Sequence, residues 1–268
     1  MVVPPYALVL APVADLRATP ADDGELVDQV HYMETTRVLG SHDGWRYVQA
    51  EDHYLGWIHG DAVELMPGSA AGRLVGRVMA PIYRAADPVA EVVGHLPAGT
   101  PLATEQVPPA PEGWTWVSVR RATEPTGSLG GYVSLDDAVS RGELPHRAPT
   151  AADLLATARA FLGTPYLWGG TSGGGIDCSG LVQQVYRLNG VGLDRDADQQ
   201  ALEGRPVEAP RAGDLLFFGS PAVTHVAMSL GGDGFIHAPM RGGAVEERTI
   251  GPERIPVSVR RYLPEVPA

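Results

Sequence analysis

Short alternations of apolar and polar residues, separated by turns rich in glycine and proline, occupy the first half of the chain. This pattern is typical of short β-strands. Residues 39–63 and residues 112–139 repeat one plan: a Gly-Trp turn into an alternating strand, a glycine followed by an aromatic residue, and an acidic turn before Ala-Val. The repeat predicts two small β-barrels.

The second half of the chain follows a helical pattern first and a strand pattern afterwards. Apolar residues recur at helical spacing over residues 151–162, and Thr150 with Asp153 predicts a capped helix start. A second helical pattern follows Cys178 and ends at Asn189-Gly190. Strands are predicted at residues 214–218, 225–230 and 235–238. Helices followed by strands indicate an α+β domain.

These patterns predict a multidomain chain of two small all-β barrels followed by an α+β domain. The predicted boundaries are residues 1–66 and 67–140 for the barrels, 141–149 for a proline-containing linker and 150–268 for the α+β domain. The barrels resemble bacterial SH3-like domains, which usually bind peptides or cell-wall material. Alternatively, the tryptophans of the repeats only fill the cores of two spacer barrels. These tryptophans are Trp45, Trp57, Trp114 and Trp116.

The charged residues exclude several kinds of chemistry. The 268 residues include 20 basic and 32 acidic side chains, for a net charge of −12, and all of the basic residues are arginine. The absence of lysine excludes a phosphate-binding loop of the Walker type, a kinase site and a Schiff base with pyridoxal phosphate, since each of these needs a lysine side chain. An acidic chain without basic runs is also repelled by nucleic acid.

The single cysteine, Cys178, excludes an intrachain disulfide and any multi-cysteine zinc or iron–sulfur site. The first residues lack a positively charged leader, and no window approaches the roughly 20 apolar residues that cross a bilayer. We therefore expect a cytoplasmic protein with no membrane partner. The oligomeric state is left open.

The densest chemical signal is the glycine-rich stretch over residues 163–182, which contains Cys178. Glycines there permit a close approach of the backbone to a ligand. Cys178 is predicted in the first turn of a helix, where the helix dipole favours the thiolate and therefore a nucleophile. The alternative is that this lone cysteine is a small buried apolar residue.

A thiolate nucleophile needs a base, and the base needs an orienting group. His225 opens an apolar strand, and His237 ends the next one. The segment Gly231-Gly232-Asp233-Gly234 predicts the hairpin turn between the strands. The hairpin is expected to place the two histidines side by side.

Residues from about 150 to 262 resemble the NlpC family of papain-like cell-wall cysteine peptidases. Five motifs carry the resemblance in the family's order: Tyr166-Leu-Trp168-Gly-Gly, Asp177-Cys178-Ser179-Gly180, Pro210-Arg-Ala-Gly213-Asp214-Leu-Leu-Phe-Phe218, Thr224-His225-Val226-Ala227 and Ile236-His237-Ala238. Two SH3-like domains before a domain of this kind resemble the YkfC-type subgroup. The resemblance implies a papain-like fold for the α+β domain.

The resemblance also implies a reaction. Cys178 would attack an amide carbonyl, His225 would protonate the leaving amine, and His237 would fix the tautomer of His225. The subgroup resembles γ-D-glutamyl-L-diamino-acid endopeptidases, which cut muropeptides between D-glutamate and diaminopimelate or lysine. A preference for a free N-terminal L-alanine suits the recycling of wall fragments inside the cell.

The remaining expected site residues belong to the oxyanion and substrate pockets. These residues are Tyr166, Trp168, Asp177, Ser179, Asp196, Tyr54 and Glu25. Asp196 matches the subgroup position that holds the substrate amine, although Ala197 follows it where a serine is frequent. In the first barrel, Tyr54 and an acid in an early loop, assigned to Glu25, would complete this pocket. A solvated surface role for Glu25 is the alternative.

No cofactor and no metal are expected, and the expected partner is a muropeptide substrate. Four alternatives stay open. The chain could be a catalytically idle protein that holds peptidoglycan with its SH3-like domains, or an autolysin acting on intact murein. It could carry a zinc ion on Cys178, His225 and His237. It could also be a papain-like amidase or acyltransferase.

Overall fold

The structure is a computed structural model that describes residues 6–65, 73–102, 110–121, 124–140, 148–240, 242–251 and 255–264. The chain forms two compact units, Met1–Leu144 and Pro145–Ala268. Both predicted barrels belong to the first unit. Most of the predicted linker, residues 141–147, lies outside the described residues, as does the junction at residues 66–72.

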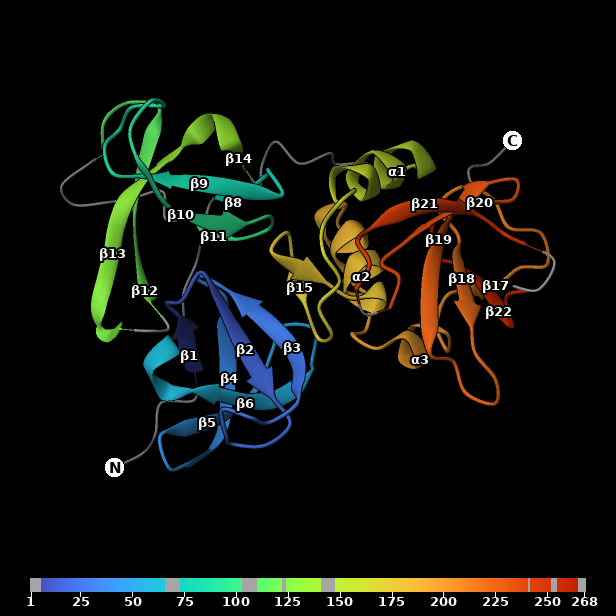
Figure 1. Cartoon of the computed structure of the whole chain (residues 1–268), viewed down its shortest axis with the longest axis horizontal. Helices are drawn as coiled ribbons and strands as arrows, with labels where there is room; N and C mark the ends of the chain where they lie inside the picture. The colour runs from blue at the N-terminus through green and yellow to red at the C-terminus, as the bar shows by residue number, and fades with distance from the viewer. Residues whose placement is uncertain are drawn as a thin grey trace. The chain divides into compact units, whose positions relative to one another are not determined.

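The first repeat forms a seven-stranded antiparallel sheet (Figure 1). Its elements are β1 (Tyr6–Val9), β2 (Val13–Arg17), β3 (Leu26–His31), β4 (Thr35–His42), β5 (Trp45–Gln49), β6 (Leu55–His59), the 3-10 helix η1 (Gly60–Ala62) and β7 (Val63–Leu65). The strand order is β3-β2-β6-β5-β4-β1-β7.

The second repeat forms two small sheets, with strand orders β10-β9-β13-β12 and β11-β8-β14. Its elements are β8 (Arg73–Val75), β9 (Met79–Tyr83), β10 (Val92–Pro97), β11 (Pro101–Leu102), β12 (Trp114–Arg121), β13 (Glu124–Ser134), the 3-10 helix η2 (Leu135–Asp137) and β14 (Ala138–Ser140). In both repeats the predicted acidic turn is a 3-10 helix, capped by His59 in one and Ser134 in the other.

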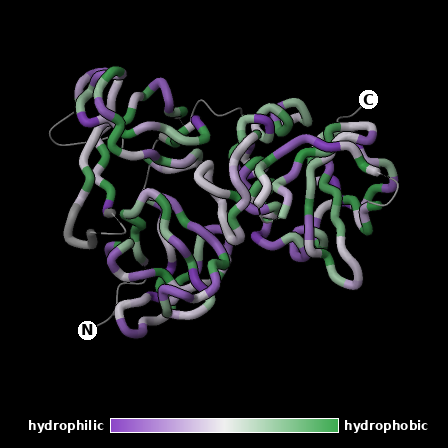
Figure 2. The backbone as a smooth tube through the Cα atoms, viewed as in Figure 1, coloured by the Kyte–Doolittle hydropathy of each residue, from purple (hydrophilic) through white to green (hydrophobic). Residues whose placement is uncertain are grey.

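The cores of the barrels are mainly aliphatic. Residues such as Leu16 and Ile58 form the first cluster, and Ile82 and Leu96 contribute to the second. Along the strands, hydrophobic and hydrophilic stretches alternate (Figure 2). Trp45 is buried, but Trp116 is 42% exposed. The interpretation of the tryptophans as core filling is therefore wrong for Trp116, since aliphatic side chains already fill the space between the sheets.

The two barrels are joined by contacts that pass from one repeat to the other. Tyr32, after β3, packs into the hydrophobic cluster of the second barrel. The Arg120 backbone N–H donates to the Leu10 carbonyl at 2.7 Å. The Arg120 guanidinium also donates to the carbonyls of Asp61 and Val63, at 3.1 and 3.0 Å. These contacts explain why the barrels form one compact unit.

The C-terminal unit combines helices with a six-stranded antiparallel sheet of order β17-β22-β18-β19-β20-β21 and a small β15-β16 hairpin. Its elements are α1 (Ala151–Ala160), β15 (Thr171–Ser172), β16 (Gly175–Ile176), α2 (Cys178–Leu188), α3 (Ala197–Gln200), β17 (Arg205–Pro206), β18 (Leu215–Phe218), β19 (His225–Gly231), β20 (Gly234–His237), β21 (Glu246–Thr249) and β22 (Ser258–Arg261). The predicted α+β pattern is confirmed.

The helix α2 packs against β19 and α1 (Figure 1). Its apolar residues Leu181, Val182 and Val185 are almost fully buried. Their burial fixes the rotation of the helix and hence the direction of its first residue. The predicted capping box of α1 is present, with Thr150 and Asp153 exchanging hydrogen bonds. Every helix in the described ranges is too short or too polar to cross a membrane.

Candidate active site

Cys178 is the first residue of α2, as predicted, and Asp177 is its N-cap. The Asp177 carboxylate accepts hydrogen bonds from the backbone N–H groups of Gly180, at 2.7 Å, and Gly169, at 2.8 Å. One side chain therefore satisfies a free N–H group of the helix start and ties the glycine-rich loop to it. The position of the cysteine follows from this cap.

The glycines of the loop allow two parts of the protein backbone to touch. A Cβ atom on Gly180 would overlap the carbonyl oxygen of Gly170. A Cβ atom on Gly170 would lie 2.5 Å from the carbonyl oxygen of Gly175. The sequence suggested an approach of the backbone to a ligand, but these two glycines instead allow the loop to pack on the start of α2.

A buried arginine, Arg195, holds the Asp177 carboxylate. Its guanidinium donates to Oδ1 and Oδ2 of Asp177, at 3.1 and 2.8 Å, and to Oγ of Ser179, at 2.9 Å. Arg195 is 1% exposed, and Asp177 and Ser179 are 7% and 6% exposed. Their side chains bind this arginine and thereby stabilise the helix start. The expected contact of Asp177 and Ser179 with the oxyanion or the substrate stays a prediction.

Burial raises the pKa of the Cys178 thiol to about 11, and the charge of Asp177 adds to the rise. Hydrogen bonds from the backbone of Val226 and Ser179 and the charge of Arg195 act in the opposite direction. The expectation of a lowered thiol pKa at the helix start is therefore wrong for the thiol by itself, because desolvation by burial outweighs the two backbone hydrogen bonds and the charge of Arg195. The thiolate needs a cationic neighbour.

The two predicted histidines lie side by side. His225 begins β19 and His237 ends β20, and the register of Met228 with Ile236 places them on one face as diagonal neighbours. Nε2 of His225 lies 2.8 Å from Nδ1 of His237. The contact between the Cys178 sulfur and the Val226 backbone places the sulfur beside the start of the same strand, next to His225 in sequence.

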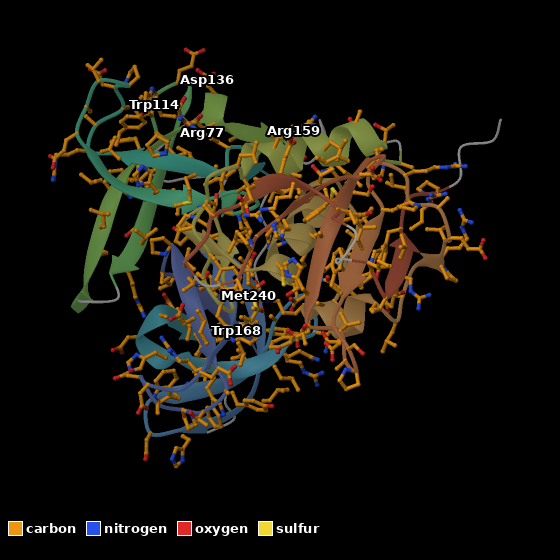
Figure 3. The ribbon with its side chains drawn as sticks, turned by 45° about the vertical axis from the view of Figure 1, so that its right-hand side comes forward. Arg77, Trp114, Asp136, Arg159, Trp168 and Met240 are labelled. Carbon is orange, nitrogen blue, oxygen red and sulfur yellow. The ribbon has the colours of Figure 1, made fainter. Side chains whose placement is uncertain are left out.

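Tyr166 and Trp168 are the two expected site residues of the glycine-rich loop. The Tyr166 backbone N–H donates to the Gly243 carbonyl at 2.8 Å, and Tyr166 also bridges to Ile176 just before the cysteine. Trp168 is 53% exposed (Figure 3). A contact between Trp168 and a substrate stays a prediction.

Asp196 precedes the short helix α3, and its backbone N–H donates to the Gln199 side chain at 3.0 Å. The Gln200 side chain donates to the carbonyls of Ser179 and Asp194, at 3.2 and 2.8 Å. Asp196 therefore lies on a segment that is anchored to the first turn of α2. A role in holding a substrate amine stays a prediction.

Tyr54 and Glu25 lie in the N-terminal unit. Tyr54 precedes β6 and is half-buried, and its backbone N–H donates to Oδ1 of Asp52 at 3.0 Å. Glu25 is an exposed residue just before β3. Asp196 belongs to the C-terminal unit, and the part of Tyr54 and Glu25 in an amine pocket with it also stays a prediction.

A zinc site on the three catalytic candidates does not fit this geometry. Nε2 of His225 and Nδ1 of His237 are directed at each other, at 2.8 Å, rather than at a common ion. In the part of the chain that the structure describes, no group of three or more His, Cys, Asp or Glu side chains is placed to hold a metal ion.

The sequence of the C-terminal unit matches the model of the NlpC/P60 family over residues 163–255. A probable endopeptidase of Haemophilus influenzae is 38% identical over 112 residues, which cover 39% of this chain and 69% of that protein. The chain belongs to the NlpC/P60 family. The members of this family are cysteine peptidases, and the side chains of Cys178, His225 and His237 agree with that chemistry. Residues 16–63 match a second model, the bacterial dipeptidyl-peptidase SH3 domain.

Two further comparisons extend the likeness. A γ-D-glutamyl-L-lysine dipeptidyl-peptidase of Bacillus subtilis is 44% identical over 107 residues, which cover 38% of this NlpC/P60 chain and 36% of that protein. The chain thus matches about a third of the length of this relative. The crystal structure of an NlpC/P60 family protein from Bacillus cereus is similar with a TM-score of 0.77 and 24% identity, over 97% of this chain and all of that chain. It supports the SH3-like and NlpC/P60 fold.

Two residues of the site had no signal in the sequence. Arg195 lies between Asp194 and Asp196, a charged run that is typical of an exposed surface. Glu246, whose Oε1 lies 3.6 Å from Nε2 of His237, begins β21. The polar sequence Glu-Glu-Arg-Thr of this strand lacks the apolar alternation of a strand. Their positions follow from contacts with residues distant in the sequence.

Proposed function

We propose that this NlpC/P60 chain is a cysteine endopeptidase of muropeptides with a free N-terminal L-alanine. It would hydrolyse the amide bond between the γ-carboxyl group of D-glutamate and an L-diamino acid, either diaminopimelate or lysine. The observation that carries the proposal is the 2.8 Å contact between His225 and His237 beside a helix that begins at Cys178. The names of the relative and of the SH3-domain family support the substrate class.

The mechanism follows from the proton positions. Since Nε2 of His225 contacts His237, Nδ1 of His225 is the atom that would exchange a proton with Cys178. The pKa of the Cys178 thiol is raised, so its thiolate needs a positive charge beside it. Transfer of the thiol proton to Nδ1 of His225 supplies this charge as an imidazolium. The sulfur then attacks the amide carbon, and the backbone N–H of Cys178, which has no partner within its helix, stabilises the oxyanion.

Collapse of the tetrahedral intermediate breaks the C–N bond. The His225 imidazolium gives its proton to the leaving amine, and water then releases the D-glutamyl product from the sulfur. Trp168 and the Tyr166 hydroxyl would contact the peptide near this bond. Asp196, with Tyr54 and Glu25 of the N-terminal unit, would bind the ammonium group of L-alanine.

The test is mass spectrometry of products from a panel of muropeptides. We expect release of the diamino acid from L-Ala-γ-D-Glu-diamino-acid peptides, and no release by Cys178→Ala. Equal activity of the variant would overturn the assignment. Acetylation of the substrate amine should strongly slow turnover, since Asp196 would lose its charged partner. Intact murein cut as fast as the free peptide would favour an autolysin instead.

A preference for the free amine would also suit recycling of released wall peptides in the cytoplasm, which we propose as the cellular role. Cell fractionation tests the location. Recovery of the protein outside the cytoplasm would contradict it.

A further inference from the structure

A carboxylate lies beyond the histidine pair. In the antiparallel pairing of β20 with β21, Glu246 is directly opposite His237. Oε1 of Glu246 lies 3.6 Å from Nε2 of His237. His225, His237 and Glu246 thus stand in a row across three neighbouring strands, β19, β20 and β21.

In a neutral imidazole one ring nitrogen carries a proton and the other accepts one. The protons along the row therefore all lie on the side nearer to Glu246. A carboxylate facing Nε2 of His237 favours a proton on that nitrogen. Nδ1 of His237 is then an acceptor, so the proton between the two rings lies on Nε2 of His225. Neutral His225 therefore has its lone pair on Nδ1, the nitrogen that must take the Cys178 proton.

We propose that Glu246 is a positioning residue of this site. Its carboxylate sets the tautomer of both histidines and stabilises the positive charge that forms when Cys178 gives its proton to His225. The proposal rests on the proposed peptidase mechanism. Glu246 is assigned no contact with the substrate.

The surroundings limit the size of the effect. The His237 side chain is 2% exposed, but the Glu246 side chain is 37% exposed, so water screens part of its charge. Nε of Arg248 also donates to Oε1 of Glu246, at 2.7 Å. The charged and titratable groups around the row are Cys178, Asp177 and Arg195 near the start of α2, with Glu246 and Arg248 on β21. We therefore expect a moderate, severalfold contribution.

The experiment uses the single cysteine of the chain and needs no peptide substrate. Alkylation by iodoacetamide reports only on Cys178, and its rate follows the thiolate fraction. Glu246→Gln should slow alkylation at neutral pH by about threefold to tenfold and move the midpoint of the pH profile upward. Nitrogen-15 NMR of the histidine rings should show that the proton is no longer confined to Nε2 of His237.

Two variants of the same strand complete the design. Glu247→Gln is the matched control, since Glu247 accepts a hydrogen bond from Arg159 at 2.7 Å, and the alternation of the strand directs it to the other face. Its profile should equal that of the wild type. Arg248→Gln removes the counter-charge of Glu246 and should move the midpoint downward, a direction that partial unfolding would not produce.

An unchanged alkylation profile and unchanged ring tautomers in Glu246→Gln would overturn the proposal. The proposal would also be overturned if the midpoint of the alkylation profile moved equally in Glu246→Gln and Glu247→Gln. If the wild type cleaves no muropeptide while the alkylation and NMR differences appear, the proposed substrate fails but the role of Glu246 stands.

Discussion

Nε2 of His225 lies 2.8 Å from Nδ1 of His237, across the hairpin that joins β19 and β20. The short turn between Gly231 and Gly234 sets the register of this hairpin, and the register sets the distance between the rings. The geometry of the histidine pair is therefore set by the pairing of β19 with β20.

Replacing His237 should impair the chemical step more than substrate binding. His237→Ala removes the partner of His225, and we expect kcat to fall about 10–100-fold with little change in KM. His237→Asn can still accept from Nε2 of His225 and should keep more activity. Steady-state kinetics on the muropeptide measure both values. A rise in KM at unchanged kcat would contradict this role.

The reactivity of Cys178 should depend on His225. Burial raises the pKa of the thiol to about 11, so without the imidazole the thiol stays protonated, and unreactive, until the pH approaches this value. In His225→Ala, the iodoacetamide rate should keep rising towards about pH 11. The wild type, with its cationic partner, should already react near neutral pH. Equal rates for both proteins at pH 7 would contradict the prediction.

The buried pair of Asp177 and Arg195 should be costly to break from one side. Asp177→Asn leaves the arginine charge without its counter-ion, and we expect a loss of about 3–5 kcal/mol in the free energy of unfolding. Exposure of the Cys178 thiol in urea, followed with a thiol reagent, measures this loss for the C-terminal unit.

Two further variants test the origin of that loss. Asp177→Asn combined with Arg195→Met should lose less than the sum of the single losses, since the unpaired charge is gone. Glu247→Gln breaks a half-exposed pair with Arg159 and should cost below about 1 kcal/mol. An Asp177→Asn variant as stable as the wild type would show that the pair carries no stability.

Gly180 should tolerate no side chain. In Gly180→Ala, the new Cβ atom overlaps the Gly170 carbonyl oxygen, so the loop or the helix start must move. We expect a loss of about 1–3 kcal/mol in stability and a marked drop in kcat. Gly192→Ala is the matched control, because a Cβ atom there meets nothing within 4 Å. Equal kinetics of the two variants would contradict the close packing.

The sequence predicted the local features of the fold well. The capping box of Thr150 and the helix start at Cys178 are predictable because each depends on residues within one turn. The hairpin of His225 and His237 is predictable because glycines at a two-residue turn determine the pairing of their flanking strands.

Other features lay beyond local reasoning. Arg195 looked like an exposed residue, yet it is buried against Asp177, which lies 18 positions earlier. The Asp177 and Ser179 side chains both bind this arginine, and their expected contact with a substrate stays a prediction. The aliphatic barrel cores, with Trp116 exposed, likewise depend on how the sheets face one another.

By itself, the sequence determined the candidate nucleophile, its helix, the histidine hairpin and the family resemblance, since these depend on residue type and short spacing. Only the tertiary structure decided the burial that raises the pKa of Cys178, the pairing of Asp177 with Arg195 and the place of Glu246. Desolvation and ion pairing depend on which distant segments surround a group, and local sequence patterns carry little information about those neighbours.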